Sequence, residues 1–269
     1  MTPPTSTATA YPLDNTASGA DAHHHGLSQL LDDFSQHRLA GLRDWSGAHV
    51  LEVGCGKGSF ARRLADLVGD RGHVTATDLK PPAFDHDRIT VIQHDLTGDA
   101  PLPAGPFDAV HTRLVLQHLR SREDILDRLI AVLGPGGVLV EEAWRPVRVN
   151  PVVAAPGPDA RYLYERFAHA SGRVFDEAGT DPNWARQVST AMENRGLTNV
   201  DTLVHGSFWR GGDPAARMVA GTISQLSDGL LAKGFTAADI DAVLELLDNP
   251  ALKVHSHLLY STSGYAPHR

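Results

Sequence analysis

An apolar stretch that ends in three alternating glycines is the feature that most constrains this chain. Residues 49–53 have the composition of a short buried strand, and Gly54, Gly56 and Gly58 follow it directly. Residues 58–68 then place apolar side chains at helical spacing. Glycine lets the backbone turn sharply and approach a ligand closely, and a helix N-terminus presents free N–H groups to that ligand. The stretch therefore predicts a strand–turn–helix unit that binds a ligand at its turn.

Composition narrows the class of protein. The chain has 269 residues, 42% of them hydrophobic, which suits one domain with additions. Its net charge of −8 argues against a nucleic-acid partner. The single cysteine, Cys55, excludes an internal disulfide and a cysteine zinc site, and is typical of a reducing compartment. Since no apolar run approaches the ~18 residues of a membrane span and the N-terminus does not resemble a signal peptide, we expect a cytoplasmic protein without a membrane partner.

Strand-like and helix-like segments alternate through the middle of the chain. Strands are predicted at 49–53, 73–78, 89–93, 107–112 and 138–142. Helices are predicted at 58–68 and 121–133, with a weak helical stretch after Pro82 and a helix that carries Leu114, Leu116 and Leu119. Repeated strand–helix units with short connections predict an α/β fold with a parallel sheet and helices on both faces.

The flanking segments are less regular. Residues 20–43 are predicted as two helices separated by a break. His23, His24 and His25 would point in three directions on a helix, which is poor geometry for one metal ion, so we expect them to face solvent. Beyond residue 145, helices are predicted at 159–178, 182–195, 213–232 and 236–247, and strands at 198–209 and 253–264.

The glycine turn differs from a dinucleotide-binding turn in two ways. The dinucleotide fingerprint Gly-x-Gly-x-x-Gly needs a third glycine at the position where Ser59 stands. Glu52, two residues before the first glycine, would repel a pyrophosphate and suits a cationic ligand. Both differences disfavour an NAD-dependent oxidoreductase.

Acidic residues at the ends of two further predicted strands extend this site. Asp78 ends the second strand, where its carboxylate can accept hydrogen bonds from both hydroxyls of a ribose. Asp95 ends the third strand, where it can accept a hydrogen bond from the exocyclic amine of adenine beside Leu96. Both are also residues that turns favour, so a purely structural role is the alternative for each. Open α/β sheets bind ligands at the carboxyl ends of their strands, so these features predict one site.

These motifs, in this order, resemble those of class I S-adenosylmethionine-dependent methyltransferases. The matching stretches are EVGCGKG at 52–58, Asp78, HDL at 94–96, FDAV at 107–110 and LGPGG at 133–137. Residues 11–15, residues 112–119 and the C-terminal segments extend the similarity to actinobacterial methyltransferases of secondary metabolism. The resemblance implies a Rossmann-like, mostly parallel sheet with an antiparallel last strand, covered by a helical lid.

The resemblance also implies a division of the chain. Residues 1–43 would form an N-terminal arm with lid helices, and residues 44–269 the methyltransferase core. Further lid helices would be inserted at about 146–195 and 211–250. The antiparallel end of the sheet would be formed by the predicted strands near the C-terminus.

The cofactor implied by the resemblance is S-adenosyl-L-methionine, with S-adenosyl-L-homocysteine as its product. The glycines would pass under the methionine part, Asp78 would hold the ribose, and the backbone of Arg113 would contact the amino group. Leu79, Asp95 and Leu96 would surround the adenine, and Tyr11 would close over the cofactor. The residues expected at this cofactor site are Tyr11, Glu52, Gly54, Cys55, Gly56, Asp78, Leu79, Asp95, Leu96 and Arg113.

Catalysis with such a cofactor requires an aligned acceptor and the exclusion of water. A hydroxyl acceptor would gain from a general base, and His118 is the first candidate, with a structural role on its helix as the alternative. His111, His169 and Glu142 are weaker candidates. Four aromatic residues are expected either to line an acceptor pocket or to pack within the lid: Trp144, Tyr162, Tyr164 and Phe167.

The predicted function is methyl transfer to a small, natural-product-like acceptor, with a hydroxyl oxygen as the target. Two alternatives stay open: C- or N-directed transfer, and a cofactor-binding cyclase or rearrangement enzyme on the same fold. No Asp-Pro-Pro-Tyr or Asn-Pro-Pro-Tyr follows the fourth predicted strand, which departs from enzymes that methylate nucleobase amines. We expect no metal ion and no nucleic-acid partner, and a homodimer is compatible with the family.

Overall fold

The computed structural model, which describes residues 12–14, 16–17 and 19–268, assembles the strand–turn–helix units into one seven-stranded sheet. The strands, in spatial order, are β3 (Ile89–Gln93), β2 (His73–Asp78), β1 (His49–Val53), β4 (Phe107–Arg113), β5 (Leu133–Arg145), β10 (Leu258–Tyr265) and β7 (Thr198–His205). The pairs from β3 through β5 are parallel, whereas β10 is antiparallel to both β5 and β7. This arrangement confirms the predicted fold class.

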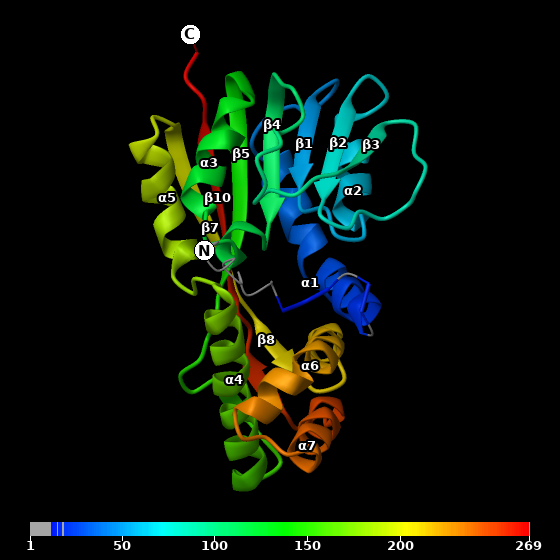
Figure 1. Ribbon diagram of the computed structural model, residues 1–269, viewed down its shortest axis with the longest axis vertical. Helices are drawn as coiled ribbons and strands as arrows, with labels where there is room; N and C mark the ends of the chain where they lie inside the picture. Colours follow the sequence, from blue (N-terminus) through cyan, green and yellow to red (C-terminus); the bar gives the residue numbers. More distant parts are fainter. Residues whose placement is uncertain (1–11, 15, 18, 269) are drawn as a thin grey trace, which may run out of the picture.

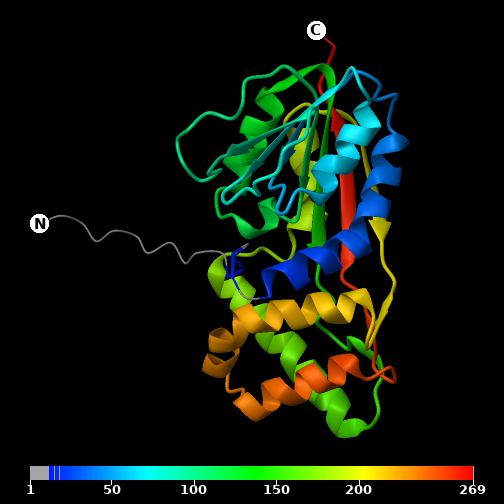
Figure 2. The same cartoon turned by 90° about the vertical axis from the view of Figure 1, so that its right-hand side faces the viewer.

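Helices cover both faces of the sheet. On one face α2 (Ser59–Val68) buries Phe60 and Leu64 against the strands. On the other, α3 (Arg122–Ala131) and α5 (Trp184–Asn194) bury Leu126 and Trp184. Figure 2 shows the sheet nearly edge on between these two layers. Both faces of the central strands are therefore inaccessible to solvent, which leaves the strand ends as the place where ligands can approach.

A smaller, mainly helical lobe lies beyond the carboxyl ends of the parallel strands (Figure 1). It contains α4 (Pro158–Ala178), α6 (Pro214–Ala232), α7 (Ala237–Asp248) and a three-stranded sheet of β6 (Val152–Ala154), β9 (Lys253–His255) and β8 (Phe208–Arg210). Aromatic and aliphatic side chains from these elements form a hydrophobic core of their own. The N-terminal helix α1 (Ala20–Ala40) packs along α6 and also contacts α2, so it connects the lobe with the main sheet.

The chain crosses between sheet and lobe at four places: residues 146–151 after β5, 179–183 between α4 and α5, 206–207 after β7 and 256–257 before β10. The N–H of Ser207 donates to the Ser256 hydroxyl at 2.8 Å, and the N–H of Ser256 donates to the Ser207 carbonyl at 3.0 Å. The last two crossings are thus joined by hydrogen bonds, and the two predicted C-terminal strands are each broken in two at this junction.

Other expectations need correction. Residues 20–43 do not form two helices, because Asp32 and Ser35, which interrupt the apolar pattern, are buried in polar contacts and α1 continues through them. Residues 114–119 hold only a short 3₁₀ helix, η1 (Leu116–His118), since Leu114 has a positive φ of 58°. The stretch between Pro82 and β3, which was predicted as weakly helical, contains no helix.

Strand β5 also differs from its predicted bounds. It begins at Leu133 rather than at residue 138, and it ends at Arg145 rather than at residue 142. Within the described part of the chain, no helix is both long enough and apolar enough to cross a membrane.

Candidate active site

A cavity of about 860 Å³ lies where the carboxyl ends of the parallel strands meet the helical lobe. Its walls come from the loops after β1 to β5, from the start of α1, from α4 and α6, and from the residue before β10. Of the predicted site residues, the cavity brings together Glu52, Gly54, Cys55, Gly56, Asp78, Leu79, Asp95, Leu96, Arg113 and His118. Tyr11 lies outside the described residues.

The glycine loop has a backbone that other residues would strain. Gly54 and Gly56 have φ values of 76° and 55°, and a Cβ on Gly54 would lie 2.2 Å from the side chain of Val115. The Asp78 carboxylate accepts hydrogen bonds from the N–H groups of Gly56 and Lys80, both at 2.9 Å. Asp78 therefore fixes the turn while it lines the cavity, and a carboxylate has further lone pairs to offer a ligand.

Glu52, in the strand just before this loop, is a buried acidic residue. Its side chain is buried, and its Oε2 atom has no hydrogen-bond partner among the described residues. The pKa of Glu52 is raised to about 8, chiefly by burial; Arg113 opposes this rise, and Asp32 and Asp78 contribute to it. A cationic group bound in the cavity would supply the partner that the carboxylate lacks.

The third strand end supplies a more open wall. The Asp95 carboxylate accepts hydrogen bonds from the N–H and hydroxyl of Thr97 at 2.8 and 2.7 Å, and these bonds lower its pKa. Leu96 is buried beside it, whereas the Leu79 side chain is 55% exposed. The region offers a flat apolar surface with a carboxylate at its edge, which are the features that an adenine ring requires.

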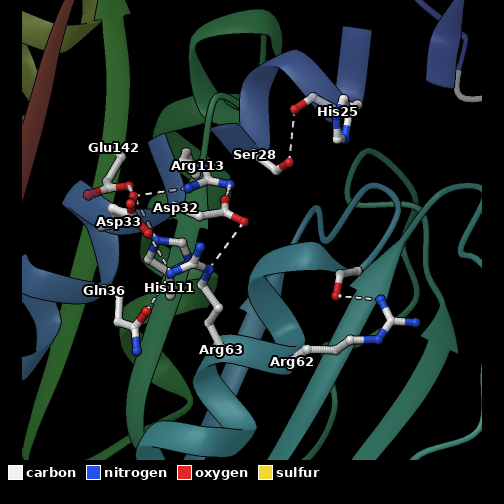
Figure 3. A network of polar contacts seen from close by, with 12 residues as sticks. His25, Ser28, Asp32, Asp33, Gln36, Arg62, Arg63, His111, Arg113 and Glu142 are labelled. Atoms are coloured by element: carbon white, nitrogen blue, oxygen red, sulfur yellow. Dashed lines mark hydrogen bonds and ion pairs between the residues drawn. The ribbon is translucent and has the colours of Figure 1, made fainter. Parts of the chain in front are cut away.

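Arg113 lines the cavity, and residues of α1 bind its guanidinium group. Its guanidinium pairs with Asp32 at 2.7 Å, donates to the Ser35 hydroxyl at 3.0 Å and lies over the Phe60 ring at 4.8 Å. Figure 3 shows Arg113 between Asp32 and Glu142, with His111 below. The network attaches α1 to the ends of β4 and β5.

His118 lies in η1, at the centre of a hydrogen-bonded chain. The N–H of Trp144 donates to Oε1 of Gln117 at 2.7 Å, so the amide nitrogen of Gln117 faces Nε2 of His118, 3.1 Å away. Nε2 is therefore an acceptor, and Nδ1 carries the proton that it donates to the Thr180 hydroxyl at 2.8 Å. Burial, followed by the charge of Arg122, lowers the pKa of His118 to about 3, so the imidazole is neutral at pH 7.

The other candidates from the sequence divide into two groups. Trp144, Tyr164 and Phe167 line the cavity. His111 and Glu142 are buried beneath it, with 3.5 Å between Nε2 and Oε2, whereas Tyr162 and His169 are exposed and do not line it. No cluster of three or more His, Cys, Asp or Glu side chains suited to a metal ion occurs in the described parts of the chain.

The expectation that the three adjacent histidines face solvent is wrong for two of them. His23 and His24 line the cavity, and only His25 is exposed. His23 forms a 2.8 Å hydrogen bond with Thr222 of α6, and His24 lies so close to Gly56 that a Cβ there would be 2.9 Å from its ring. Burial, followed by the nearby His24, lowers the pKa of His23 to about 4. The signal available in the sequence was the helical spacing of His23 with Leu27, which also lines the cavity.

Gln117, Arg148, Trp209 and His257 also line the cavity without having been singled out. Only Gln117 had a local signal, its position beside His118. The other three come from the junction between sheet and lobe, whose geometry the sequence did not reveal.

Comparison with known proteins assigns the fold and site to a family. A family model described as a methyltransferase domain matches residues 23–202, well over half of the chain. The chain belongs to this methyltransferase family. The matched range includes the glycine loop, Asp78, Asp95, Arg113 and His118, but it ends before α6 and before His257.

Individual relatives of this methyltransferase domain match over shorter stretches. Methyltransferase str3 of Strobilurus tenacellus is 35% identical over 131 residues, 48% of this chain and 46% of its own. The ubiquinone/menaquinone biosynthesis C-methyltransferase UbiE of Ectopseudomonas mendocina is 30% identical over 160 residues, 55% of this chain and 59% of its own. The match thus spans about half the length of each of these relatives.

The fold is shared with solved structures at low sequence identity. The phosphoethanolamine N-methyltransferase 2 of Haemonchus contortus, solved with phosphomonomethylethanolamine and S-adenosylhomocysteine, superposes with a TM-score of 0.51 and 15% identity. The superposition covers 87% of this chain and 52% of that one. This similarity supports the fold of the sheet and its helices.

Proposed function

We propose that this protein transfers a methyl group from S-adenosyl-L-methionine to a hydroxyl oxygen of a small-molecule acceptor. The observation that carries the proposal is Glu52, a buried carboxylate without a hydrogen-bond partner for Oε2 among the described residues, at the wall of a cavity formed by the glycine loop. Such a group suits a ligand with a cationic amino acid part and opposes a pyrophosphate. When bound, the cofactor supplies a methyl group that its sulfonium has already activated.

Different residues around the cavity would hold different parts of the cofactor. Glu52 and the glycine loop would hold the methionine part, and Asp78 would use its remaining lone pairs for the ribose. Leu79, Asp95 and Leu96 would hold the adenine. Secondary-metabolite biosynthesis, a cytoplasmic location and the division into arm, core and lid stay predictions from the sequence.

The proposed acceptor half of the cavity supports a small and largely apolar substrate. Trp144, Tyr164 and Phe167 form its walls, and these walls exclude water from the reacting atoms. Nε2 of His118 would take the hydroxyl proton, which requires the acceptor hydroxyl to displace the amide of Gln117. Oxygen is our assignment because this imidazole, neutral and fixed in its tautomer, is oriented as a hydrogen-bond acceptor.

The first experiment separates this proposal from the alternatives. The purified protein is titrated with S-adenosylhomocysteine and with NAD, and then incubated with labelled S-adenosylmethionine and a panel of hydroxylated aromatic compounds. We expect binding of S-adenosylhomocysteine alone, and products heavier by one methyl group on oxygen. A product methylated on carbon or nitrogen would replace the oxygen assignment, and rearrangement with the cofactor unconsumed would exclude transfer.

Binding of S-adenosylhomocysteine should depend on pH through Glu52. In the free protein the pKa of Glu52 is about 8, so the group is protonated at pH 6. A bound ammonium group favours the carboxylate and lowers this pKa, so binding releases a proton below pH 8. Affinity should therefore rise by up to about tenfold per pH unit between pH 6 and 8, and then level off.

Calorimetry in two buffers of different ionisation enthalpy measures the released proton directly. Methylthioadenosine, which lacks the amino acid part, is the matched control and should bind without this proton release. The Glu52→Gln variant should bind S-adenosylhomocysteine more weakly and without pH dependence in this range. An affinity of the unaltered protein that stays constant from pH 6 to 8 would contradict the role of Glu52.

A further inference from the structure

Three aromatic rings meet at the end of the cavity that lies over β5 and β10. The rings of Trp144 and His257 are 5.3 Å apart between centroids, those of Trp209 and His257 are 5.1 Å apart, and those of the two tryptophans 6.1 Å. Their planes are inclined by 61° to 76°, so the rings form a corner rather than a stack. All three side chains line the cavity.

Two polar groups at this corner lack partners among the described residues. Neither ring nitrogen of His257 has a hydrogen bond there, and Nδ1 is buried. Nε of Arg148 is also buried without an acceptor, although its two terminal nitrogens bind Asp176 at 2.6 and 2.8 Å. Both buried atoms are closed off from the cavity, and Nε of Arg148 lies against Gly172 of α4. Nε2 of His257 is not buried and has no hydrogen bond within the described residues, so it is the polar atom of the corner that a ligand can reach.

The charge at the corner limits what that ligand is. Asp176 pairs with Arg148 through both terminal nitrogens, so the guanidinium charge is already balanced. Burial, followed by the charge of Arg148, lowers the pKa of His257 to about 4, so its imidazole is neutral. The corner thus offers one ring nitrogen of a neutral imidazole, which donates or accepts according to its tautomer, and no unbalanced positive charge for a carboxylate.

The position of the corner relates it to the proposed reaction. Most of the predicted cofactor residues lie at the ends of β1, β2 and β3, Arg113 and His118 lie at the end of β4, and Trp144 and His257 lie at the ends of β5 and β10. Because the sheet order places β4 between β1 and β5, His118 lies between the cofactor region and the aromatic corner. An acceptor that reaches from His118 to His257 would fill the remaining cavity.

We propose that this corner is the acceptor-specificity site, and that it selects planar aromatic acceptors bearing an uncharged hydroxyl or carbonyl oxygen that binds Nε2 of His257. This assignment rests on the proposed methyl transfer only for its use in catalysis. The tryptophan rings supply the apolar surface for the aromatic system. Nε2 of the imidazole recognises the oxygen, and Asp176, which balances the charge of Arg148, disfavours a carboxylate nearby.

Binding of three matched probes tests the corner. Isothermal titration compares 2-naphthol, naphthalene and 2-naphthoate, with the protein alone and with protein saturated with S-adenosylhomocysteine. We expect 2-naphthol to bind about five- to tenfold more tightly than naphthalene, the difference that one or two hydrogen bonds make, and 2-naphthoate to bind more weakly than 2-naphthol. Tighter binding of 2-naphthoate would overturn the proposal, because it would require an unbalanced positive charge.

A pair of histidine variants locates the bound oxygen. His257→Phe keeps an aromatic ring between the tryptophans and removes both polar nitrogens, whereas His255→Phe alters an exposed ring that contacts Phe208 and does not line the cavity. The first should lose the preference for 2-naphthol over naphthalene, and the second should keep it. The assignment would be overturned if the two variants showed the same preference for 2-naphthol over naphthalene.

The same titrations distinguish this proposal from the proposed function. If S-adenosylhomocysteine does not bind but the probes discriminate as expected, the methyl transfer fails and the corner stands. If S-adenosylhomocysteine binds but His257→Phe leaves the probe preference intact, the assignment of the corner fails and the methyl transfer stands.

Discussion

Replacing His118 with asparagine is expected to lower kcat by about 100-fold or more, because a positioned general base contributes roughly that factor to proton transfer. Asparagine keeps a polar side chain beside Thr180 but cannot accept a hydroxyl proton as imidazole does. Affinity for S-adenosylhomocysteine should change little, since the predicted cofactor residues other than Arg113 lie at the ends of other strands. The measurement is single-turnover transfer to the preferred hydroxylated acceptor, with the affinity measured separately by calorimetry.

His169→Asn is the matched control for this variant. His169 is exposed on α4 and does not line the cavity, so its replacement should leave both kcat and affinity as they are. The base role of His118 would be excluded by a kcat within threefold of the unaltered protein. The pKa of His118 in the free protein, about 3, is too low for an efficient base at pH 7, so the base role requires that it rise when the acceptor hydroxyl replaces the Gln117 amide.

Replacing Asp32 with asparagine should lower the free energy of unfolding by about 3 kcal/mol, because it leaves the guanidinium of Arg113 buried without its ion-pair partner. The side chains of Asp32 and Arg113 are only 3% and 13% exposed, and the pair is 2.7 Å long. Urea unfolding followed by circular dichroism measures the change. Affinity for S-adenosylhomocysteine should fall as well, because the same contact holds α1, and with it His24, against the glycine loop.

The neighbouring residue provides a close control. Asp33 forms a 2.7 Å pair with Arg63, but its side chain is 87% exposed. Asp33→Asn should therefore have little effect on stability, since exposed ion pairs are screened by solvent. If the two variants unfold at the same urea concentration, the contact of Asp32 with Arg113 does not anchor α1.

The sequence predicted the sheet and the glycine loop well because their signals are local. The strand before Gly54, the glycines themselves and the acids that end the next strands lie within one stretch of chain, and each strand end adds a residue to the same edge. Parallel strands with short connections allow few other arrangements. The residues predicted for the cofactor therefore line one cavity, apart from Tyr11, which lies outside the described residues, and their binding of the cofactor stays a prediction.

The errors concern residues whose partners are distant in the chain. The break predicted within residues 20–43 is absent because Asp32 and Ser35 are held by Arg113 and Glu142, which are 81 and 107 residues away. His23 looked solvent-facing because Thr222 of α6, which covers it, is 199 residues away. His257 follows β9 in a stretch that looked like one continuous strand, and only the junction between sheet and lobe turns its ring towards Trp144. Tertiary contacts decided each of these positions, and a single sequence does not contain them.

The four crossings between sheet and lobe, two of them joined by hydrogen bonds, also bear on how ligands exchange. A lobe attached by one linker could swing open, but a lobe joined through paired strands and the mutual bonds of Ser207 and Ser256 resists such a hinge. Another part of the cavity wall is the segment around Leu13 and Asp14. There Asp14 pairs with Lys80 at 2.6 Å, and the N–H of Asp14 donates to Gln225 at 2.7 Å. Both residues of that ion pair are partly exposed, so salt weakens it. Ionic strength should therefore act on the rate at which product leaves rather than on the chemical step.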